Sequence, residues 1–276
     1  MDLSILSQKD EALNLVVEKL GRNPVDFSEK MNLIKTGGKK DDAWLAAGVL
    51  LPLFFKDGEL VFQLIKRAST VPQPGDISCP GGMLNTFLDP FFRPFTAHRF
   101  SPLLREDVLK YMRRRGRFDF RNVTLFLANA LRESWEEVGL NPFNVTFLGP
   151  LPCYDLKSFR RTIFPITGYV KNKWHFRPNW EVDRVVEIPL RTFFNDENYG
   201  IFSVESLIEI KKNIDRVRNF PCLIYRDDVL WGATFNIIMS FLKIVFDLDL
   251  PKTHSKRVVK KVLYPDYLTG SPRQLS

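Results

Sequence analysis

The pattern of apolar and polar positions predicts an amphipathic helix close to the N-terminus. Within residues 7–20 the apolar side chains recur at helical spacing, with Ser7 placed to cap the helix and Gly21 to end it. Residues 22–43 are polar and predict an irregular connection. We therefore expect one N-terminal helix and a linker ahead of the main domain.

The middle of the chain predicts a sheet. Apolar runs at 46–55 and 60–66 flank an Asp-Gly pair, which is a strong hairpin signal between two strands. Further strands are indicated by the apolar runs at 145–149, 162–170, 185–190, 221–225 and 229–232. We expect a covering helix after Gly232 and irregular structure between 190 and 221. Strands interrupted by a few helices, without repeats, indicate an α/β sandwich.

The segment 132–140 places three carboxylates on one side of a predicted helix. Glu133, Glu136 and Glu137 fall within an arc of about 100°. An apolar stripe is centred on the opposite side, formed by Leu127, Leu131, Trp135 and Val138. Like charges at this spacing repel, and a hard divalent cation such as Mg²⁺ or Mn²⁺ would remove that cost. The spacing alone leaves a solvated acidic helix face as the alternative.

Two sequence motifs carry a resemblance to a known family. Arg-Glu-x-x-Glu-Glu-x-Gly-Leu at 132–140 resembles the second half of the Nudix signature, and Pro80-Gly81-Gly82 resembles its first half. The chain is thus similar to Nudix hydrolases, which cleave nucleoside diphosphates linked to another moiety. The resemblance covers about residues 44–247 and implies a mixed sheet between helices, with the signature as loop–helix–loop.

The resemblance also implies roles for these residues. Glu133, Glu136 and Glu137 are expected to hold Mg²⁺ or Mn²⁺ and to activate water, with the carbonyl of Gly81 as a further metal ligand. One glutamate not fully engaged with metal would accept the proton of that water. Arg132, four residues before Glu136, is expected to orient the acidic cluster.

A long insertion separates the two halves of the signature, at about residues 85–123. Its first part, 87–100, is aromatic and rich in proline; its second, 103–121, reads as helical and basic and includes Arg113-Arg114-Arg115. Between 99 and 121 there are eight Lys or Arg and three Asp or Glu residues. The insertion is interpreted as a solvated helical excursion, as a lid or dimer element whose arginines meet substrate phosphates, or as a nucleic-acid contact. The last is ranked lowest, because its aromatic residues lack a base-stacking spacing.

A second resemblance concerns the substrate. Residues 64–68 and 75–82 resemble the extra motif of coenzyme A pyrophosphatases, which cut coenzyme A into 3′,5′-ADP and 4′-phosphopantetheine. Segments around 147–152, 164–165, 187–190 and 231–234 are similar too. This chain departs at Pro72 or Gln73, where the family has a second basic residue. The family's early acidic position falls on Leu88, with Asp89 beside it.

Other residues are weaker candidates. Arg67 is expected to bind a substrate phosphate together with the loop of Gly81 and Gly82, because guanidinium matches phosphate geometry; a surface charge at a strand end is the alternative. Ser69 and Thr70 follow it. A downstream acid is a candidate for an extra metal ligand or base, against ordinary loop charge: Glu181, Asp183 or Glu187. Stacking on an adenine, against packing, is considered for Trp174, His175 and Trp180.

Composition limits the class of protein. The 276 residues are 45% hydrophobic and carry a formal charge of +8, which favours anionic partners. The three cysteines are far apart and suit free thiols in a reducing compartment. No secretory or membrane-spanning segment is evident, so a cytoplasmic location is expected. We expect an N-terminal part at 1–43, a Nudix domain at 44–250 and a mobile basic tail at 251–276.

These observations converge on one functional hypothesis and two alternatives. The first is metal-dependent hydrolysis of the pyrophosphate bond of coenzyme A or acyl-coenzyme A. The second is the same chemistry on NADH, ADP-ribose or a nucleotide sugar, and the third is a binding module of Nudix fold without turnover. The expected partner is a small nucleotide-type substrate, with nucleic acid disfavoured and a homodimer left open.

Overall fold

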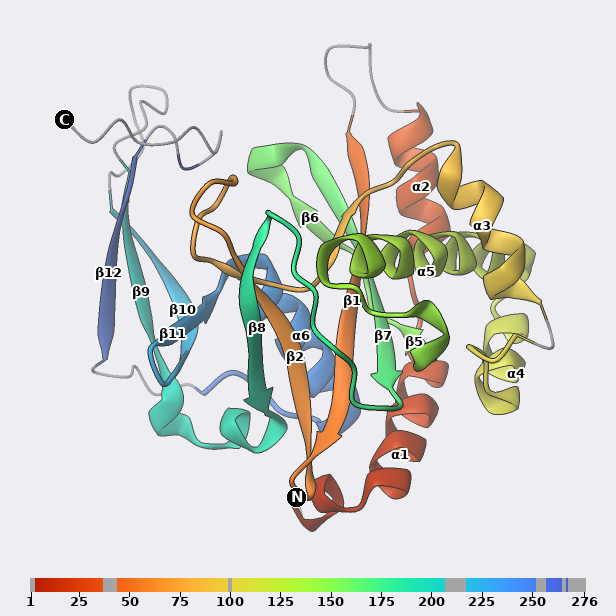
Figure 1. The fold of residues 1–276 in the computed structure, drawn as a ribbon, viewed down its shortest axis with the longest axis horizontal. Helices are drawn as coiled ribbons and strands as arrows, with labels where there is room; N and C mark the ends of the chain where they lie inside the picture. The colour runs from red at the N-terminus through yellow and green to blue at the C-terminus, as the bar shows by residue number, and fades with distance from the viewer. Residues whose placement is uncertain are drawn as a thin grey trace.

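An eight-stranded mixed sheet forms the centre of the molecule (Figure 1). The computed structural model describes residues 3–36, 44–98, 101–206, 217–251, 257–264 and 267. Strands β1 (Leu45–Lys56) and β2 (Glu59–Arg67) form the predicted hairpin, and its turn residues Asp57 and Gly58 have φ of 51° and 83°. The rest of the sheet consists of β3 (Ile77–Ser78), β4 (Gly81–Met83), β5 (Val145–Pro150), β6 (Tyr154–Leu156), β7 (Arg161–Val170) and β8 (Val182–Pro189).

Strand pairing brings distant segments together at the middle of this sheet. The longest pairing is parallel, between β1 and β7, and β5 follows β7 at one edge. On the other side β1 pairs with β2, which pairs in turn with β3 and β8. The short strand β4 pairs antiparallel with β1, placing Gly81 opposite Val49 and Gly82 opposite Gly48.

Helices cover both faces of the sheet, which confirms the predicted α/β sandwich. On one face lies α5 (Arg117–Val138), whose Phe126 ring stacks on Phe164 of β7 at 3.8 Å between centroids. Helix α2 (Phe27–Thr36) adds Phe27, edge-on to Phe164 at 5.1 Å. On the other face lies α6 (Gly232–Phe246), whose Phe241 contacts Phe62 of β2 at 5.5 Å.

The N-terminal prediction needs two corrections. Helix α1 (Lys9–Arg22) buries the predicted apolar side, but Ser7 lies in a preceding 3-10 turn and the helix runs through Gly21. The described part of 22–43 is not irregular, since it contains α2. That helix exists because Phe27 and Met31 are buried in the core, and two apolar residues among polar ones were too weak a signal.

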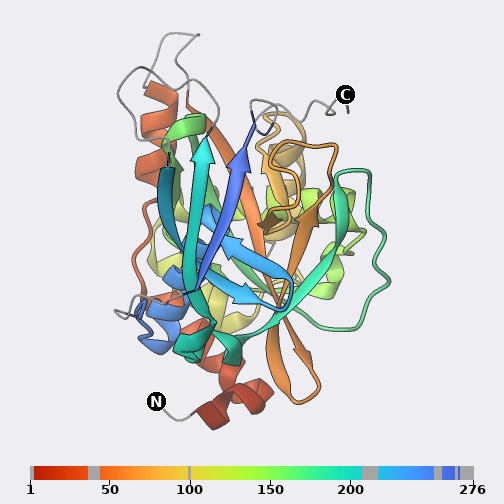
Figure 2. The ribbon, with the colours of Figure 1, turned by 90° about the vertical axis from the view of Figure 1, so that its left-hand side faces the viewer.

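A second sheet was only partly predicted. It contains β9 (Tyr199–Ser206), β10 (Val217–Tyr225), β11 (Asp228–Trp231) and β12 (Val258–Leu263), in the order β11-β10-β9-β12 (Figure 2). The expectation of an irregular stretch before 221 is wrong at β9 and at the start of β10. The expectation of a mobile basic tail is wrong at β12, which pairs parallel with β9.

The insertion is helical, as predicted, and merges with the signature helix. It forms α3 (Leu88–Ala97), α4 (Glu106–Arg114) and the first turns of α5 (Figure 1). Arg113–Arg115 lie beside the N-terminal end of α5, whereas Glu133 lies about 25 Å further along the same helix. The interpretation that these arginines meet substrate phosphates beside the acidic cluster is therefore wrong.

The buried face of α5 is rotated relative to the predicted stripe. Trp135, expected among the apolar positions, is 53% exposed, while Ser134 and Glu137 are buried. The difference arises because the end of α5 lies under β4 and the segment before β8, where backbone groups of Asn179 and Arg177 donate to carbonyls of α5. No helix among the described residues is long and apolar enough to cross a membrane.

Replacing Asp228 with asparagine is expected to lower the free energy of unfolding by about 2 kcal/mol at neutral pH. Asp228 of β11 ties the second sheet to the first, accepting hydrogen bonds from Lys66 at 2.8 Å and Arg184 at 2.7 Å. Burial raises the pKa of this carboxyl, but the hydrogen bonds from Arg184 and Lys66 outweigh burial and hold the pKa below its usual value.

The stabilisation by Asp228 is therefore complete above about pH 4 and is lost as the pH falls through the lowered pKa. Urea unfolding of both proteins should show a large difference at pH 7 and a smaller one near about pH 3. Asp183→Asn, at an exposed position of β8, is the control. An equal difference at both pH values would contradict the role of the ion pair.

Candidate active site

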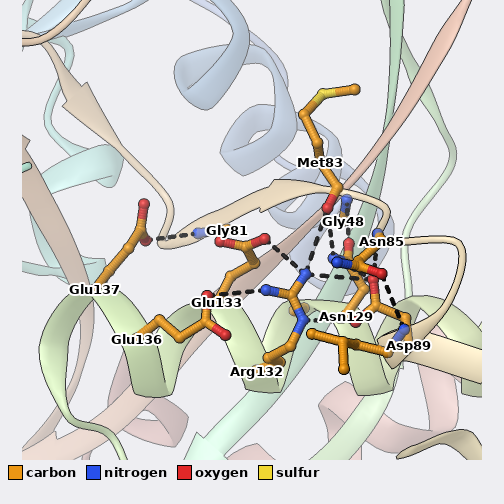
Figure 3. A network of polar contacts seen from close by, with 12 residues as sticks. Gly48, Gly81, Met83, Asn85, Asp89, Asn129, Arg132, Glu133, Glu136 and Glu137 are labelled. Atoms are coloured by element: carbon orange, nitrogen blue, oxygen red, sulfur yellow. Dashed lines mark hydrogen bonds and ion pairs between the residues drawn. The ribbon is translucent and has the colours of Figure 1, made fainter. Parts of the chain in front are cut away.

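Arg132 lies at the centre of the acidic cluster and binds three carboxylates (Figure 3). Its Nε donates to Asp89 Oδ1 at 2.7 Å, its Nη2 to Glu133 Oε1 at 2.7 Å, and its Nη1 to Glu136 Oε2 at 2.9 Å. Asp89 is completely buried. A buried carboxylate without a partner would be strongly destabilising, so Asp89 fixes the position of the guanidinium. Arg132 in turn orients Glu133 and Glu136.

Asp89 is the acidic residue of the insertion that reaches the cluster. The sequence placed Leu88 at the early acidic position of the signature, with Asp89 as its neighbour; in the structure it is Asp89 that contacts Arg132. Its Oδ2 also accepts hydrogen bonds from Asn129 Nδ2 at 3.0 Å and from the Asn85 backbone at 2.7 Å. The insertion makes an alignment with the signature unsafe here, and the contact of Asp89 with Arg132 is visible only in the structure.

Asn129 was missed by the sequence analysis and joins three elements. Its Oδ1 accepts from the Gly48 backbone of β1 at 2.7 Å, and its Nδ2 donates to the Met83 carbonyl of β4 at 3.1 Å as well as to Asp89. A Cβ at Gly48 would lie 2.3 Å from this oxygen. The signal was present in the sequence, since Asn129 is a polar residue inside an otherwise apolar stretch of α5.

The two glycines of β4 let carboxylates approach the backbone. Gly81 has φ of +153°, which L side chains rarely adopt, and its N–H donates to Glu137 Oε2 at 2.9 Å. At Gly82 a Cβ would lie 2.5 Å from the carboxylate of Glu133. The first half of the signature therefore lies directly against the second half.

The electrostatics of the cluster favour a bound cation. Burial raises the pKa of Glu137 to about 8; the Gly81 hydrogen bond opposes this shift, and the negative charge of Glu133 adds to it. Burial also raises the pKa of Glu133, against the effect of Arg132. Glu137 forms no ion pair with any described residue. Two adjacent carboxylates with raised pKa values are stabilised in the charged form by a cation.

The donor set suits a hard divalent cation, although the side chains do not yet converge on one point. Carboxylate oxygens and a backbone carbonyl are the ligands that Mg²⁺ prefers. Among the described residues, no three His, Cys, Asp or Glu side chains are gathered closely enough to hold a metal ion. Arg132 binds oxygens of Glu133 and Glu136, while Glu137 accepts a hydrogen bond from the Gly81 N–H. The chemistry of the residues fits the expected metal.

Arg67 lies near Glu137, and Arg161 lies near Arg67. Arg67, at the end of β2, donates from Nε to the Pro72 carbonyl at 2.7 Å, and its charge acts to lower the pKa of Glu137. Arg161, at the start of β7, is half-buried, and its Nε has no hydrogen-bond partner in the part of the chain described. Burial and then the charge of Arg67 lower the pKa of Arg161. The sequence analysis named Arg67 but missed Arg161, which only the strand pairing places here.

The loop between β2 and β3 is anchored by the C-terminal segment. Asp76 accepts hydrogen bonds from Lys261 of β12 at 2.7 Å, from Trp231 at 3.3 Å and from the hydroxyl of Tyr267. The Gln73 N–H donates to the Tyr267 carbonyl at 2.7 Å. These contacts fix the loop that follows Arg67 and leads to Gly81.

The structure shows which of the weaker candidate residues lie near the acidic cluster and which do not. Glu181 lies close enough to Glu137 to raise its pKa. Glu187 is instead bound to Lys56 at 2.5 Å and to Gln63 at 3.1 Å, which makes it a structural residue. The side chains of Ser69, Thr70, Asp183, His175 and Trp180 are exposed, while Trp174 donates to Gln63 at 3.4 Å and packs on Phe176.

Comparison with known proteins supports the resemblance. No family model matches the chain. It is 34% identical over 114 residues to "Uncharacterized Nudix hydrolase NudL" of Pectobacterium atrosepticum, covering 41% of this chain and 55% of that protein. It is 26% identical over 153 residues to "Peroxisomal coenzyme A diphosphatase NUDT7" of Mus musculus, covering 55% of this chain and 50% of that protein. The chain thus spans about half the length of each of these relatives.

Among solved structures, a MutT/nudix family protein from Enterococcus faecalis matches with 12% identity and a TM-score of 0.43, covering 80% of this chain and 74% of that one. A likeness at that level supports no conclusion by itself. The two relatives in sequence confirm the similarity to Nudix hydrolases that both halves of the signature predicted, and one of them is named for coenzyme A.

Alanine is expected to have different effects at the two glycines of β4. At Gly81 the new Cβ would lie 2.4 Å from the Gly48 carbonyl oxygen, and the φ of +153° is itself unfavourable. Gly81→Ala should therefore lower the free energy of unfolding by about 2 kcal/mol or more. At Gly82 the Cβ meets only the end of the Glu133 side chain, which can rotate, so Gly82→Ala should cost less than about 1 kcal/mol. Urea unfolding compares the two, and equal losses would be incompatible with this geometry.

Proposed function

We propose that this chain is a divalent-metal-dependent pyrophosphohydrolase acting on coenzyme A or an acyl-coenzyme A. Water attacks a phosphorus atom of the diphosphate, the P–O–P bond breaks, and 3′,5′-ADP and (acyl-)4′-phosphopantetheine are released as ionised monoesters together with two protons. The observation that carries the proposal is the three-glutamate face of α5, bound through Arg132 and packed against Gly81 and Gly82.

The metal would be held by carboxylate oxygens of Glu133, Glu136 and Glu137, with the Gly81 carbonyl as a further ligand. When bound, Mg²⁺ or Mn²⁺ neutralises charge on the diphosphate and lowers the pKa of a bound water. Support comes from the hard oxygen donors and from the raised pKa values of Glu133 and Glu137. Arg132 keeps Glu133 and Glu136 on the side of α5 that faces β4.

The remaining chemistry belongs to the side chains of the site. A carboxylate oxygen of Glu133 or Glu137 accepts the proton of the attacking water. Arg67 and Arg161 hold phosphate oxygens of the substrate, because a guanidinium binds phosphate through paired N–H donors. The unpartnered Nε of Arg161 supports this role, since a buried donor without a partner is costly until it meets an acceptor.

The coenzyme A part of the proposal rests on the motif at 64–68 and 75–82 and on the relative named for that substrate. The structure gives the motif a physical role: Asp76 anchors its loop to Lys261 and Trp231, and Pro72 accepts from Arg67. Pro72 cannot supply the second basic residue of the family motif. Another dinucleotide is therefore the second candidate substrate, and we propose that Arg161, near Arg67, supplies the missing cation.

Glu136→Gln is expected to reduce kcat/KM by about 100-fold or more, because it removes a charged metal ligand while preserving the shape of the side chain. The purified protein would be incubated with coenzyme A, dephospho-coenzyme A, NADH and ADP-ribose, with Mg²⁺ and with Mn²⁺, and the products separated by chromatography. Glu106→Gln, an exposed carboxylate on α4, is the matched control.

Each outcome of this experiment decides between hypotheses. Release of 3′,5′-ADP by the wild type and the control, but not by Glu136→Gln, supports the whole proposal. Cleavage of NADH or ADP-ribose alone would retain the chemistry and reject coenzyme A. Absence of cleavage with every substrate and both metals would favour a binding module.

Arg161→Met is expected to raise KM about tenfold or more while changing kcat little, because one charge-assisted contact to a phosphate is lost. Arg113→Met is the control, because Arg113 is an exposed arginine of α4 close to the N-terminal end of α5, far from the glutamates. Comparison of coenzyme A with dephospho-coenzyme A shows which phosphate is bound: an effect on both indicates the diphosphate, and an effect on coenzyme A alone indicates the 3′-phosphate. An unchanged KM for both substrates would contradict the assignment.

A further inference from the structure

Helix α3 is attached to the protein by its polar side chains. Asp89 and Thr96 are seven residues apart, and therefore lie on one face of the helix, and both are buried. Asp89 binds Arg132 of α5, and Thr96 Oγ1 lies within hydrogen-bond distance of the Thr124 carbonyl of α5, at 3.0 Å. This is the reverse of the usual arrangement, in which a surface helix packs through its apolar stripe.

The opposite face of α3 presents phenylalanine rings to solvent. Phe87 precedes the helix and is 78% exposed; Phe91 and Phe95 follow at intervals of four residues and are 63% and 64% exposed. Phe92, 41% exposed, lies beside them and contacts Phe91 edge-on at 5.4 Å. We call these four residues the α3 aromatic face.

Two arginines of α5 extend this face. At helical spacing, Arg117 and Arg121 lie on the same side of α5 as Thr124, to which α3 is attached, whereas Phe118 lies about 120° around the helix from Thr124. Both arginines are exposed. The α3 aromatic face is therefore bordered by cations where α3 ends, and contiguous exposed apolar surface of this kind marks an interaction site.

The positive charge of Arg117 and Arg121 indicates which kind of partner fits the α3 aromatic face. A two-fold contact between two copies of the chain would match this face with itself, so both cationic borders would add positive charge to one interface, which is disfavoured. An anionic bilayer fits both features, because aromatic side chains enter the interface between headgroups and acyl chains while arginines meet the headgroups. Helix α3 spans ten residues and would lie along the interface.

We propose that the α3 aromatic face, with Arg117 and Arg121, docks the protein on the surface of an anionic phospholipid membrane. The rings of Phe91 and Phe95 enter the interfacial region and the two arginines contact phosphate or carboxylate groups of the lipids. This docking does not depend on the reaction catalysed. It would nevertheless hold Asp89, on the buried side of the same helix, in a fixed orientation to the membrane.

The test is co-sedimentation of the full chain with vesicles of phosphatidylcholine alone and of phosphatidylcholine containing about 30 mol% phosphatidylserine. We expect the wild type to partition onto the anionic vesicles, and Phe91→Ser with Phe95→Ser to reduce the partition coefficient about tenfold or more. Arg117→Ala with Arg121→Ala should reduce binding to the anionic vesicles selectively. Phe143→Ser is the matched control, since Phe143 is 62% exposed at the other end of α5.

Thermal unfolding followed by circular dichroism checks that each variant is folded, which their exposed positions lead us to expect. The proposal is overturned if the wild type does not sediment with anionic vesicles, or if the phenylalanine double variant sediments as well as the wild type. Sedimentation velocity supplies an independent arm. A wild-type dimer that the double variant converts to a monomer would assign the face to a second copy of the chain and would also overturn the proposal.

Discussion

The contact between Arg132 and the completely buried Asp89 is the interaction on which the candidate site depends. Asp89 belongs to the insertion, whereas Arg132 and the glutamates belong to the signature helix. Because a buried carboxylate requires a charged partner, the guanidinium cannot leave without a large penalty. The Nη1 and Nη2 groups of Arg132 then donate to Glu136 and Glu133 respectively. A single buried pair thus determines how two carboxylates that repel each other are presented to β4.

The other parts of the site follow from the packing of α5 against the central sheet. Asn129 binds the backbone of β1 and β4, so the distance between helix and strands is fixed by polar contacts as well as by the Phe126–Phe164 stack. That distance leaves no room for a side chain at Gly48, where a Cβ would lie 2.3 Å from Asn129 Oδ1. Strand pairing at the same end of the sheet then brings Arg67, at the end of β2, near Glu137 and brings Arg161, at the start of β7, near Arg67.

Most of the central fold could be predicted from the sequence, because the patterns that indicate its turns, helices and strands each lie within a short stretch of the chain. The Asp-Gly turn, the helical spacing of α1 and the glutamate spacing of α5 need no distant partner. The features that were missed depend on contacts across the sequence. Strand β12 is stabilised by β9, some sixty residues earlier. Helix α2 is stabilised by Phe27 in a core built from α5 and β7. The roles of Asp89 and Arg161 appear only once the insertion is folded and β7 is paired.

The anchoring of Asp76 by Lys261 and Tyr267 has a consequence for synthesis on the ribosome. The nascent chain completes α5 with its glutamates long before residue 267 leaves the exit tunnel, since translation is vectorial. During that interval the loop after Arg67 lacks its last tether. The acidic half of the site is therefore synthesised first, and the loop that follows Arg67 reaches its final position only after residue 267 has been added.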